Sequence, residues 1–160
     1  MRKRTKSVDF EYPRNLQFEC DKCAICCGDT ERRIRSILLM HVEAQLISDR
    51  TGKKIEDFAQ ETGLSQPYTH CIKKNSDGKC VFLRKDSCLI YTERPLVCMF
   101  YPFELKSDTG GRHVFGYTDE CPCVGRGRKL ARRYFTDLFK QLKQTTEKNR
   151  QFASDRSLLG

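Results

Sequence analysis

Four cysteines fall within the eight residues from Cys20 to Cys27, which read Cys-Asp-Lys-Cys-Ala-Ile-Cys-Cys. Core packing does not require this density, because a buried cysteine acts as a small apolar residue that Ala or Val can replace. A Cys-x2-Cys spacing lets one tight turn aim two sulfur atoms at a common point. A third cysteine at the same interval is typical of loops that give three thiolates to an iron-sulfur cluster. The stretch therefore predicts metal ligation, with a further ligand from elsewhere in the chain.

The rest of the chain holds enough thiols to complete that site and to build a second one. Zinc sites more often take their ligands as two separated pairs. We expect Cys27 to serve a second site, because the side chains of the adjacent residues Cys26 and Cys27 should diverge. A disulfide framework and ordinary buried or redox cysteines are the two alternatives. The further cysteines are Cys71, Cys80, Cys88, Cys98, Cys121 and Cys123.

Composition favours a metal-stabilised domain in a reducing compartment. The 160 residues are 38% hydrophobic and 32% charged, which is a thin supply of core for this length. Structural metal sites contribute on the order of 10 kcal/mol to folding, so ligation would compensate and its removal should unfold the chain. The basic N-terminus is followed by no apolar segment, and no run approaches the roughly 18 apolar residues that span a membrane. We therefore expect a cytoplasmic protein without a membrane partner, in which disulfides are disfavoured.

The elements that must position these cysteines are short. We expect little regular structure in residues 1–18 and a strand within 33–39. Helical spacing of apolar residues then predicts a helix from Met40 or His41 to about Gly52, and a second short helix over 55–60.

From Tyr68 to Phe103 the pattern changes to extended pieces separated by turns. The turn signal Asn75-Ser-Asp-Gly78 predicts a hairpin between 70–74 and 80–83. Thr92 is a candidate cap for a helical turn that presents Cys98. Further strands are expected at 88–91, 103–106 and 113–117.

Apolar residues recurring at i and i+4 predict a C-terminal amphipathic helix over 127–148. The predicted fold class is α+β: a small cysteine-rich metal-binding domain with short strands and this helix. The predicted organisation is a polar N-terminal arm over 1–16, a single domain over 17–150 and a frayed tail over 151–160.

Five motifs in a fixed order carry a resemblance to a known family. They are Cys20-x2-Cys23-x2-Cys26-Cys27, Gly78-Lys-Cys80-x-Phe82-Leu83, Cys88-x-Ile90-Tyr91-x2-Arg94-Pro95-x2-Cys98, Tyr101-Pro102-Phe103 and Cys121-Pro122. Across residues 17–127 the chain resembles the CxxCxxCC cysteine-cluster family, also called YkgJ-like, a zinc- or iron-chelating or Fe-S-cluster-containing domain. The sequence departs from the usual pattern at Ala24, Met99 and Cys123.

The resemblance implies a set of eight metal-ligating cysteines, and some family members act as flagellin lysine N-methylases. Cys71 and Cys123 fall outside the set, and the departure at Cys123 leaves open whether Cys121 or Cys123 is the late ligand, with Cys121 favoured. The eight are Cys20, Cys23, Cys26, Cys27, Cys80, Cys88, Cys98 and Cys121.

We divide the eight thiols between two centres and favour a 4Fe-4S cluster over Zn2+, because of the triple Cys-x2 spacing. One centre takes Cys20, Cys23, Cys26 and Cys121; the other takes Cys27, Cys80, Cys88 and Cys98. No catalytic residue and no site for another cofactor is identified. The three histidines, His41, His70 and His113, are expected to be surface or hydrogen-bonded residues and not ligands.

Three classes of function stay open at this point. The first is a metal protein with a redox or methyl-transfer role, although no S-adenosylmethionine-binding loop is recognisable. The second is a zinc-stabilised module, without catalytic activity, that binds a protein or RNA partner; the basic stretches Arg2–Lys6 and Arg126–Arg133 would suit nucleic-acid phosphates, and a solvated tail and helix face explain them as well. The third is a metal carrier.

Overall fold

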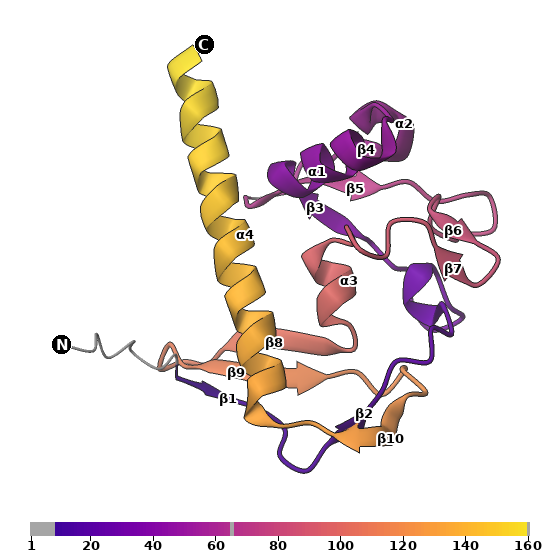
Figure 1. The fold of residues 1–160 in the computed structure, drawn as a ribbon, viewed down its shortest axis with the longest axis vertical. Coiled ribbons are helices and arrows are strands. Elements are labelled where there is room, and N and C mark those ends of the chain that lie inside the picture. The colour runs from indigo at the N-terminus through magenta and orange to yellow at the C-terminus, as the bar shows by residue number, and fades with distance from the viewer. Residues whose placement is uncertain (1–8, 65, 160) are drawn as a thin grey trace.

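Short strands and helices are joined by long loops in the computed structural model of the protein, which describes residues 9–64 and 66–159 (Figure 1). The predicted α+β class is confirmed, including a helix at the C-terminal end. In chain order the elements are β1 (Phe10–Glu11), β2 (Gln17–Phe18), the 3-10 helix η1 (Ile25–Cys27), β3 (Leu38–Met40), α1 (His41–Thr51), α2 (Ile55–Phe58), β4 (Ala59–Glu61), β5 (Tyr68–Ile72), β6 (Leu83–Arg84), β7 (Ser87–Cys88), α3 (Leu96–Phe100), β8 (Phe103–Ser107), β9 (His113–Tyr117), β10 (Val124–Lys129) and α4 (Arg132–Leu159).

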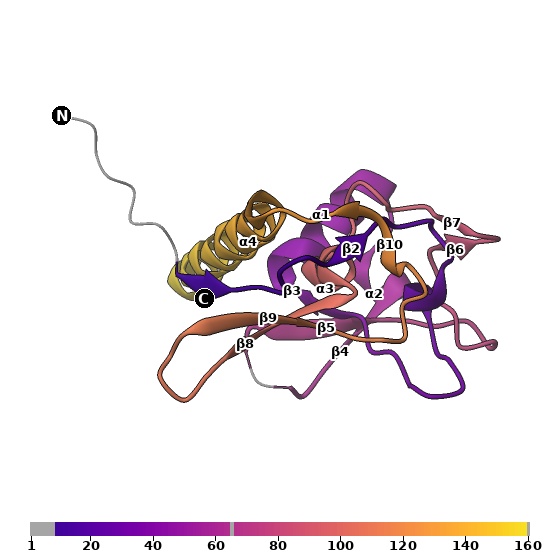
Figure 2. The same ribbon diagram turned by 90° about the horizontal axis from the view of Figure 1, so that it is seen from below.

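The strands form two separate three-stranded sheets and two strand pairs. One sheet has the order β1-β9-β8, with β1 parallel to β9, and it lies against the first half of α4 (Figures 1 and 2). The other sheet has the antiparallel order β3-β5-β4 and lies with α1 and α2 at the other end of the molecule. The pairs are β10 with β2 and β6 with β7. Helix α3 lies between the two sheets, and η1 lies on the side away from α4 (Figure 1).

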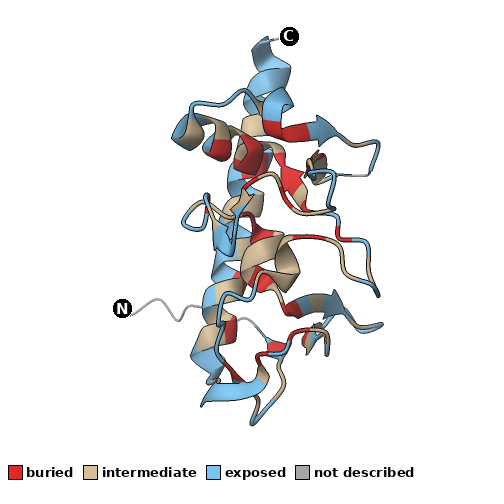
Figure 3. Ribbon diagram, turned by 90° about the vertical axis from the view of Figure 1, so that its right-hand side faces the viewer, coloured by how far each residue is buried: buried red, intermediate tan, exposed pale blue. Residues whose placement is uncertain are grey.

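Two clusters of buried side chains form the interior (Figure 3). The first, here the aromatic core, is rich in phenylalanine and packs beneath α4. The second, here the aliphatic core, packs beneath α1 and α2. The aromatic core consists of Phe10, Phe18, Met40, Leu96, Phe100, Phe103, Phe115, Cys121, Cys123, Phe135 and Phe139. The aliphatic core consists of Ile37, Leu39, Ala44, Ile47, Phe58, Ala59, Ile72, Cys80, Phe82 and Ile90.

The buried Glu43 ties α1 to α3. Its carboxylate accepts a hydrogen bond from the backbone N–H of Met40 at 2.9 Å and another from the N–H of Leu96 at 2.7 Å. These two groups stand at the N-terminal ends of the two helices, where backbone donors lack partners within the helix. Glu43 therefore closes both helix starts and fixes where α3 begins.

The C-terminal helix differs from its predicted bounds at both ends. The predicted start at Gly127 is wrong, because Gly125 and Gly127 adopt φ values of +87° and +79° and this segment pairs with β2 as strand β10. The predicted end at residue 148 is also wrong, since α4 continues to Leu159. Tertiary contacts hold the extra turns: the Asn149 side chain accepts a hydrogen bond from the N–H of Val42, and Phe152 stacks on His41 at 4.5 Å.

The central segment keeps the predicted turn but not the predicted strand pairing. Gly78 adopts φ +77° and its N–H donates to the carbonyl of Asn75 at 2.9 Å, so the turn is confirmed. The expected 70–74 to 80–83 ladder is reduced to an isolated bridge between Lys74 and Cys80. Strand β5 pairs instead with β3 and β4, where its Ile72 side chain enters the aliphatic core.

Several shorter expectations also need correction. Thr92 does not cap α3, because its hydroxyl donates to Glu93 and Pro95 occupies the N-cap position. The expected second helix over 55–60 ends at Phe58, where the chain enters β4. The expected irregular N-terminal region includes strands β1 and β2, since Phe10 and Phe18 enter the aromatic core; residues 1–8, which hold the basic stretch Arg2–Lys6, lie outside the described part. The predicted α1 and the strands at β8 and β9 are confirmed.

Candidate metal centre

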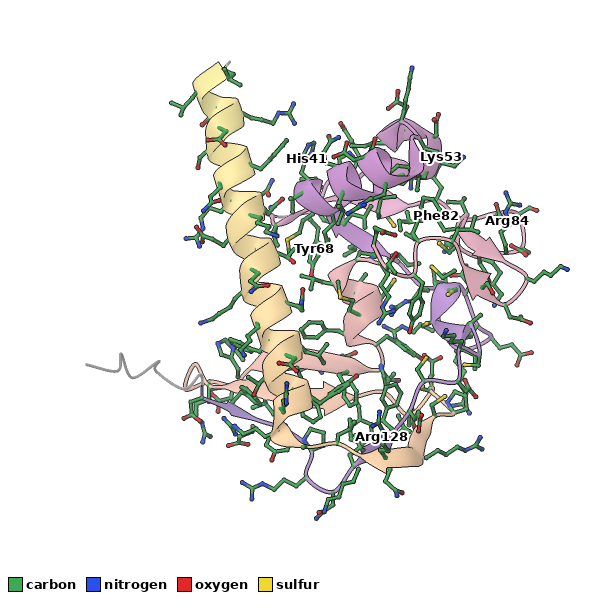
Figure 4. All side chains as sticks on the ribbon, viewed as in Figure 1. His41, Lys53, Tyr68, Phe82, Arg84 and Arg128 are labelled. Atoms are coloured by element: carbon green, nitrogen blue, oxygen red, sulfur yellow. The ribbon has the colours of Figure 1, made fainter. Side chains whose placement is uncertain are left out.

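Nine of the ten cysteines line one cavity of about 310 Å³. Sulfur atoms gather around η1, between β6–β7 on one side and β2–β10 on the other (Figure 4). All eight cysteines of the expected set are present there, together with Cys123; Cys71 is absent, because it lies on β5 and its thiol donates to the carbonyl of Ile72 at 3.7 Å. The nine are Cys20, Cys23, Cys26, Cys27, Cys80, Cys88, Cys98, Cys121 and Cys123.

Two left-handed residues shape the loop that carries the first four thiols. Lys22 and Ala24 adopt φ values of 60° and 62°, which reverse the chain twice within three residues. The Asp21 carboxylate accepts a hydrogen bond from the N–H of Cys23 at 3.0 Å, and the N–H of Lys22 donates to the sulfur of Cys20 at 3.4 Å. This loop conformation places the sulfur atoms of the Cys-x2-Cys segment on the cavity wall.

A tight backbone contact brings Cys80 to Cys27. The N–H of Cys80 donates to the carbonyl of Cys27 at 2.7 Å, and Gly28 bridges to Lys79. A Cβ atom on Gly28 would lie only 2.6 Å from the carbonyl oxygen of Gly78. Glycine is therefore required after Cys27 for steric reasons, although Gly28 itself is in an extended conformation.

Two local elements place Cys88 and Cys98 on the opposite wall. Cys88 ends the two-residue strand β7, whose partner β6 pairs Leu83 with Cys88. Cys98 lies in the first turn of α3, and its N–H donates to the carbonyl of Pro95 at 2.9 Å. Burial raises the pKa of Cys98 to about 12, while the nearby charge of Arg35 acts in the opposite direction.

The thiols of Cys26 and Cys27 do not diverge, contrary to the expectation from their adjacency. They form a hydrogen bond with each other, which raises the pKa of Cys26 and lowers that of Cys27. Both sit in η1, where the N–H of Cys27 donates to the carbonyl of Ala24 at 3.0 Å and the tight turn aligns the two side chains. The thiols of Cys80, Cys88 and Cys98 act electrostatically on Cys27, and the thiol of Cys26 acts on those same three, so Cys26 and Cys27 share their thiol neighbours.

A second group of donors gathers at the other end of the cavity. The ligand atoms of Asp21, Cys23 and Cys123 lie within 4.8 Å of one another, and Cys121 acts electrostatically on both cysteines of the triad. The structure thus brings Cys123, which the family pattern leaves out, to the same wall as Cys121. The sequence showed Cys123 only as the second thiol of the pair Cys121-Pro122-Cys123, and it held no signal for the approach of this thiol to Asp21.

Two polar side chains lie beside the thiols: Arg35, which was not identified from the sequence, and Tyr101 of the Tyr101-Pro102-Phe103 motif. Arg35 is only 8% exposed, donates to the carbonyl of Val97 at 3.1 Å and stacks over the ring of Tyr101 at 4.9 Å. Within the described part of the chain, its Nε atom and the Tyr101 hydroxyl are buried without a hydrogen-bond partner. Unpaired buried donors are costly. A negatively charged thiolate-metal centre would supply the missing acceptors, so these two groups fit a metal site at this place.

The histidines lie away from the cavity. The ring of His70 is within hydrogen-bond distance of the Thr69 hydroxyl at 2.8 Å, His41 stacks on Phe152, and the ring of His113 lies 5.2 Å from that of Phe139. None of the three is among the cavity-lining residues. The lining therefore offers thiols and the carboxylate of Asp86, and the carboxylate of Asp21 lies beside Cys23 and Cys123.

Comparison with known proteins gives one family and two relatives. The model of the CxxCxxCC family, described as "Putative zinc- or iron-chelating domain", matches residues 19–123, which is more than half of the chain. Two proteins of Methanocaldococcus jannaschii are similar, both named as uncharacterized: MJ0661 is 24% identical over 123 residues, covering 67% of this chain and 57% of its own length, and MJ0939 is 24% identical over 136 residues, covering 82% and 45%.

The chain spans about half the length of these curated relatives. No solved structure matches the chain. The matched region begins one residue before Cys20 and ends at Cys123, so it contains every thiol that lines the cavity. The chain therefore belongs to the CxxCxxCC family of zinc- or iron-chelating domains.

Proposed function

We propose that the protein holds a resident metal centre through the eight cysteines of the family pattern. The observation that carries this proposal is the convergence of all eight on one cavity while Cys71 stays outside it. Free thiols without a metal would gain nothing from this crowding, because each charge disfavours ionisation of its neighbours. A bound cation reverses that balance by stabilising the thiolates.

We place a 4Fe-4S cluster among Cys27, Cys80, Cys88 and Cys98, with Zn2+ as the alternative. These thiols line the cavity together, and the thiol of Cys26 acts electrostatically on Cys80, Cys88 and Cys98. Iron-sulfur clusters are held by cysteine thiolates, and hydrogen bonds and nearby charges tune their potential. Arg35 offsets part of the negative charge here. When bound, such a cluster would supply one-electron redox chemistry, and the surrounding side chains would hold it and limit its contact with water.

We also propose metal ligation by the remaining thiols of the set, which are Cys20, Cys23 and Cys121. They line the same cavity next to the loop that begins at Cys20.

All ten cysteines are free thiols, which agrees with a reducing compartment such as the cytoplasm. A redox or methyl-transfer role belongs to this proposal through the family resemblance alone.

Anaerobic purification followed by metal analysis tests the proposal. An iron-sulfur protein should be brown, with broad absorbance at about 400 nm and iron matched by acid-labile sulfide. Cys80→Ser should lower the metal content, whereas the matched variant Cys71→Ser should keep it. A colourless protein with stoichiometric zinc would select Zn2+ instead, and a protein without bound metal after growth with adequate iron and zinc would refute the proposal.

The alternative is a zinc-stabilised module that binds a protein or RNA partner without catalysis. The exposed side chains of Arg126, Arg128 and Lys129 on β10 favour it, because they form a basic strip beside the cysteine loop (Figure 4 labels Arg128). RNA retention that falls steeply with salt, and that weakens when Arg126 and Arg128 become Gln, would support this alternative.

No helix in residues 9–64 and 66–159 has the length and apolar character to cross a membrane.

A further inference from the structure

Two donors next to the cavity have no role in the family's set of eight cysteines. Asp21 and Cys123 bring their ligand atoms within 4.8 Å of each other and of the Cys23 thiol. Cys123 is 2% exposed, and its thiol lies within 4.8 Å of the nearest ligand atom of Asp21. Asp21 is exposed at the rim, so the triad runs from the surface into the aromatic core.

The fold holds these distant segments together. Strand β2 pairs with β10, with Phe18 opposite Val124, so the loop after β2 and the residues before β10 leave the pair side by side. Gly127 allows the close approach, since a Cβ atom there would lie 2.3 Å from the Cβ of Glu19. The N–H of Val124 donates to the carbonyl of Cys121 at 3.2 Å, which closes a turn around Cys123. The triad is therefore a product of backbone pairing and does not depend on one flexible side chain.

The spacing of the three donors suits a single cation. Each Zn–S bond measures about 2.3 Å and each Zn–O bond about 2.0–2.2 Å, so two ligands of one ion lie at most about 4.6 Å apart. The triad approaches this separation before any rearrangement. Cys121 lines the same cavity but lies outside the group of ligand atoms within 4.8 Å of one another, and it is the candidate for a fourth ligand after rearrangement.

We infer that Asp21, Cys23 and Cys123 form a mixed carboxylate-thiolate site for a divalent cation of the Zn2+ class. Iron-sulfur clusters are held by cysteine thiolates, whereas Zn2+ accepts Asp beside Cys in a four-coordinate site. The inference deepens the proposed metal-binding function and rests on it, but it adds two ligands and separates this site chemically from the group Cys27, Cys80, Cys88 and Cys98. Binding releases the protons of the Cys23 and Cys123 thiols to solvent as the two metal–sulfur bonds form.

Co2+ binding to the full chain tests the inference, because thiolate ligands give Co2+ an intense charge-transfer absorbance and tetrahedral geometry gives visible bands. The anaerobically purified protein is treated with a chelator under conditions that leave any absorbance at about 400 nm unchanged, and is then titrated with Co2+. Asp21→Asn and Cys123→Ser are the test variants. Asp155→Asn, at an exposed position near the end of α4, and Cys71→Ser are the matched controls.

Cys123→Ser should reduce the charge-transfer absorbance per bound Co2+ and weaken binding. Asp21→Asn should keep that absorbance and also weaken binding. Loss of an outer-shell partner alone costs about 10–100-fold in metal affinity, so each of these ligand losses should cost at least about tenfold. Both controls should match the wild type, and far-ultraviolet circular dichroism checks that every variant is folded.

Wild-type affinity and spectra in both test variants would overturn the inference while leaving the proposed function intact, if the metal content that depends on Cys80 persists. Absence of any metal that depends on Cys80 would instead overturn the proposed function. Because Asp21 is exposed, Asp21→Asn keeps the inference testable even if Cys123→Ser fails to fold.

Discussion

The carboxylate of Glu43 should be a main determinant of how α3, and with it Cys98, is held. Glu43 is 7% exposed, and its two oxygens accept from the N–H of Met40 and the N–H of Leu96. In Glu43→Gln one of these acceptors becomes an NH2 group that faces a backbone donor. The variant therefore leaves one buried N–H without a partner at the start of either α1 or α3.

The expected cost follows from the number of hydrogen bonds lost. A hydrogen bond to a charged group contributes about 1.5–3 kcal/mol, and burial raises the pKa of Glu43, so desolvation of the carboxylate offsets part of this gain. We expect Glu43→Gln to lower the free energy of unfolding by about 1.5 kcal/mol and Glu43→Ala, which loses both acceptors, by about 3 kcal/mol or more. At this chain length the Gln variant should melt about 3–6 °C lower.

Urea denaturation and thermal melting of the anaerobically purified protein measure these losses. Glu31→Gln, at an exposed position, is the matched control and should unfold like the wild type. Glu43→Gln should also release metal to a chelator faster, because Cys98 lies two residues after Leu96. Unfolding free energies within about 0.5 kcal/mol of the wild type for both Glu43 variants would refute the role of Glu43 in holding the starts of α1 and α3.

Three further predictions concern the loop, α4 and the metal. Gly28→Ala should lower the melting temperature and speed metal loss, since its Cβ would lie 2.6 Å from the Gly78 oxygen, whereas Gly63→Ala, with open space around it, should not. NMR titration of His41 should give a pKa below 6.5, because burial and the charge of Arg156 disfavour the imidazolium. The stabilisation that depends on neutral His41 should be fully present above pH 6.5 and be lost as pH falls through the folded-state pKa. A pKa of His41 above 6.5 would contradict its packing against Phe152. Metal removal under reducing conditions should abolish near-ultraviolet circular dichroism while part of the helical far-ultraviolet signal persists in α4; an unchanged cooperative melt would contradict a structural role for the metal.

Local signals were sufficient for the elements whose ends are set by their own residues. The helix that ends at Gly52 needs φ +69° there, and the strand pair around Asp108–Gly111 needs a turn that Gly and Asp supply. The cysteine loop was identifiable for the same reason, since its spacing is read within eight residues.

Nonlocal contacts explain the parts that the sequence did not predict. Residues 127–129 were expected to begin the C-terminal helix, but pairing with β2 and the positive φ of Gly125 and Gly127 make 124–129 a strand. Strand β5 pairs with β3 and β4 and does not form the expected ladder with residues 80–83. Pairing with β3 and β4 buries Ile72 and His70. The approach of Cys123 to Asp21 depends on that same β2–β10 pair, so spacing along the chain carried no information about it.

The cavity lies between the two cores, and this position links the metal to the stability of the whole domain. Cys121 and Cys123 belong to the aromatic core, whereas Cys80 belongs to the aliphatic core, with Cys27 packed against it. Three contacts within the protein join the two cores: helix α3, the hydrogen bonds of Glu43, and the hydrogen bond from the N–H of Val42 to the Asn149 side chain. A structural metal contributes on the order of 10 kcal/mol to folding, and each of these contacts contributes far less. Each core alone is also small for a chain that is 38% hydrophobic. Because thiols from both cores meet at one cavity, we expect metal ligation to stabilise this domain as a larger shared core does in other proteins.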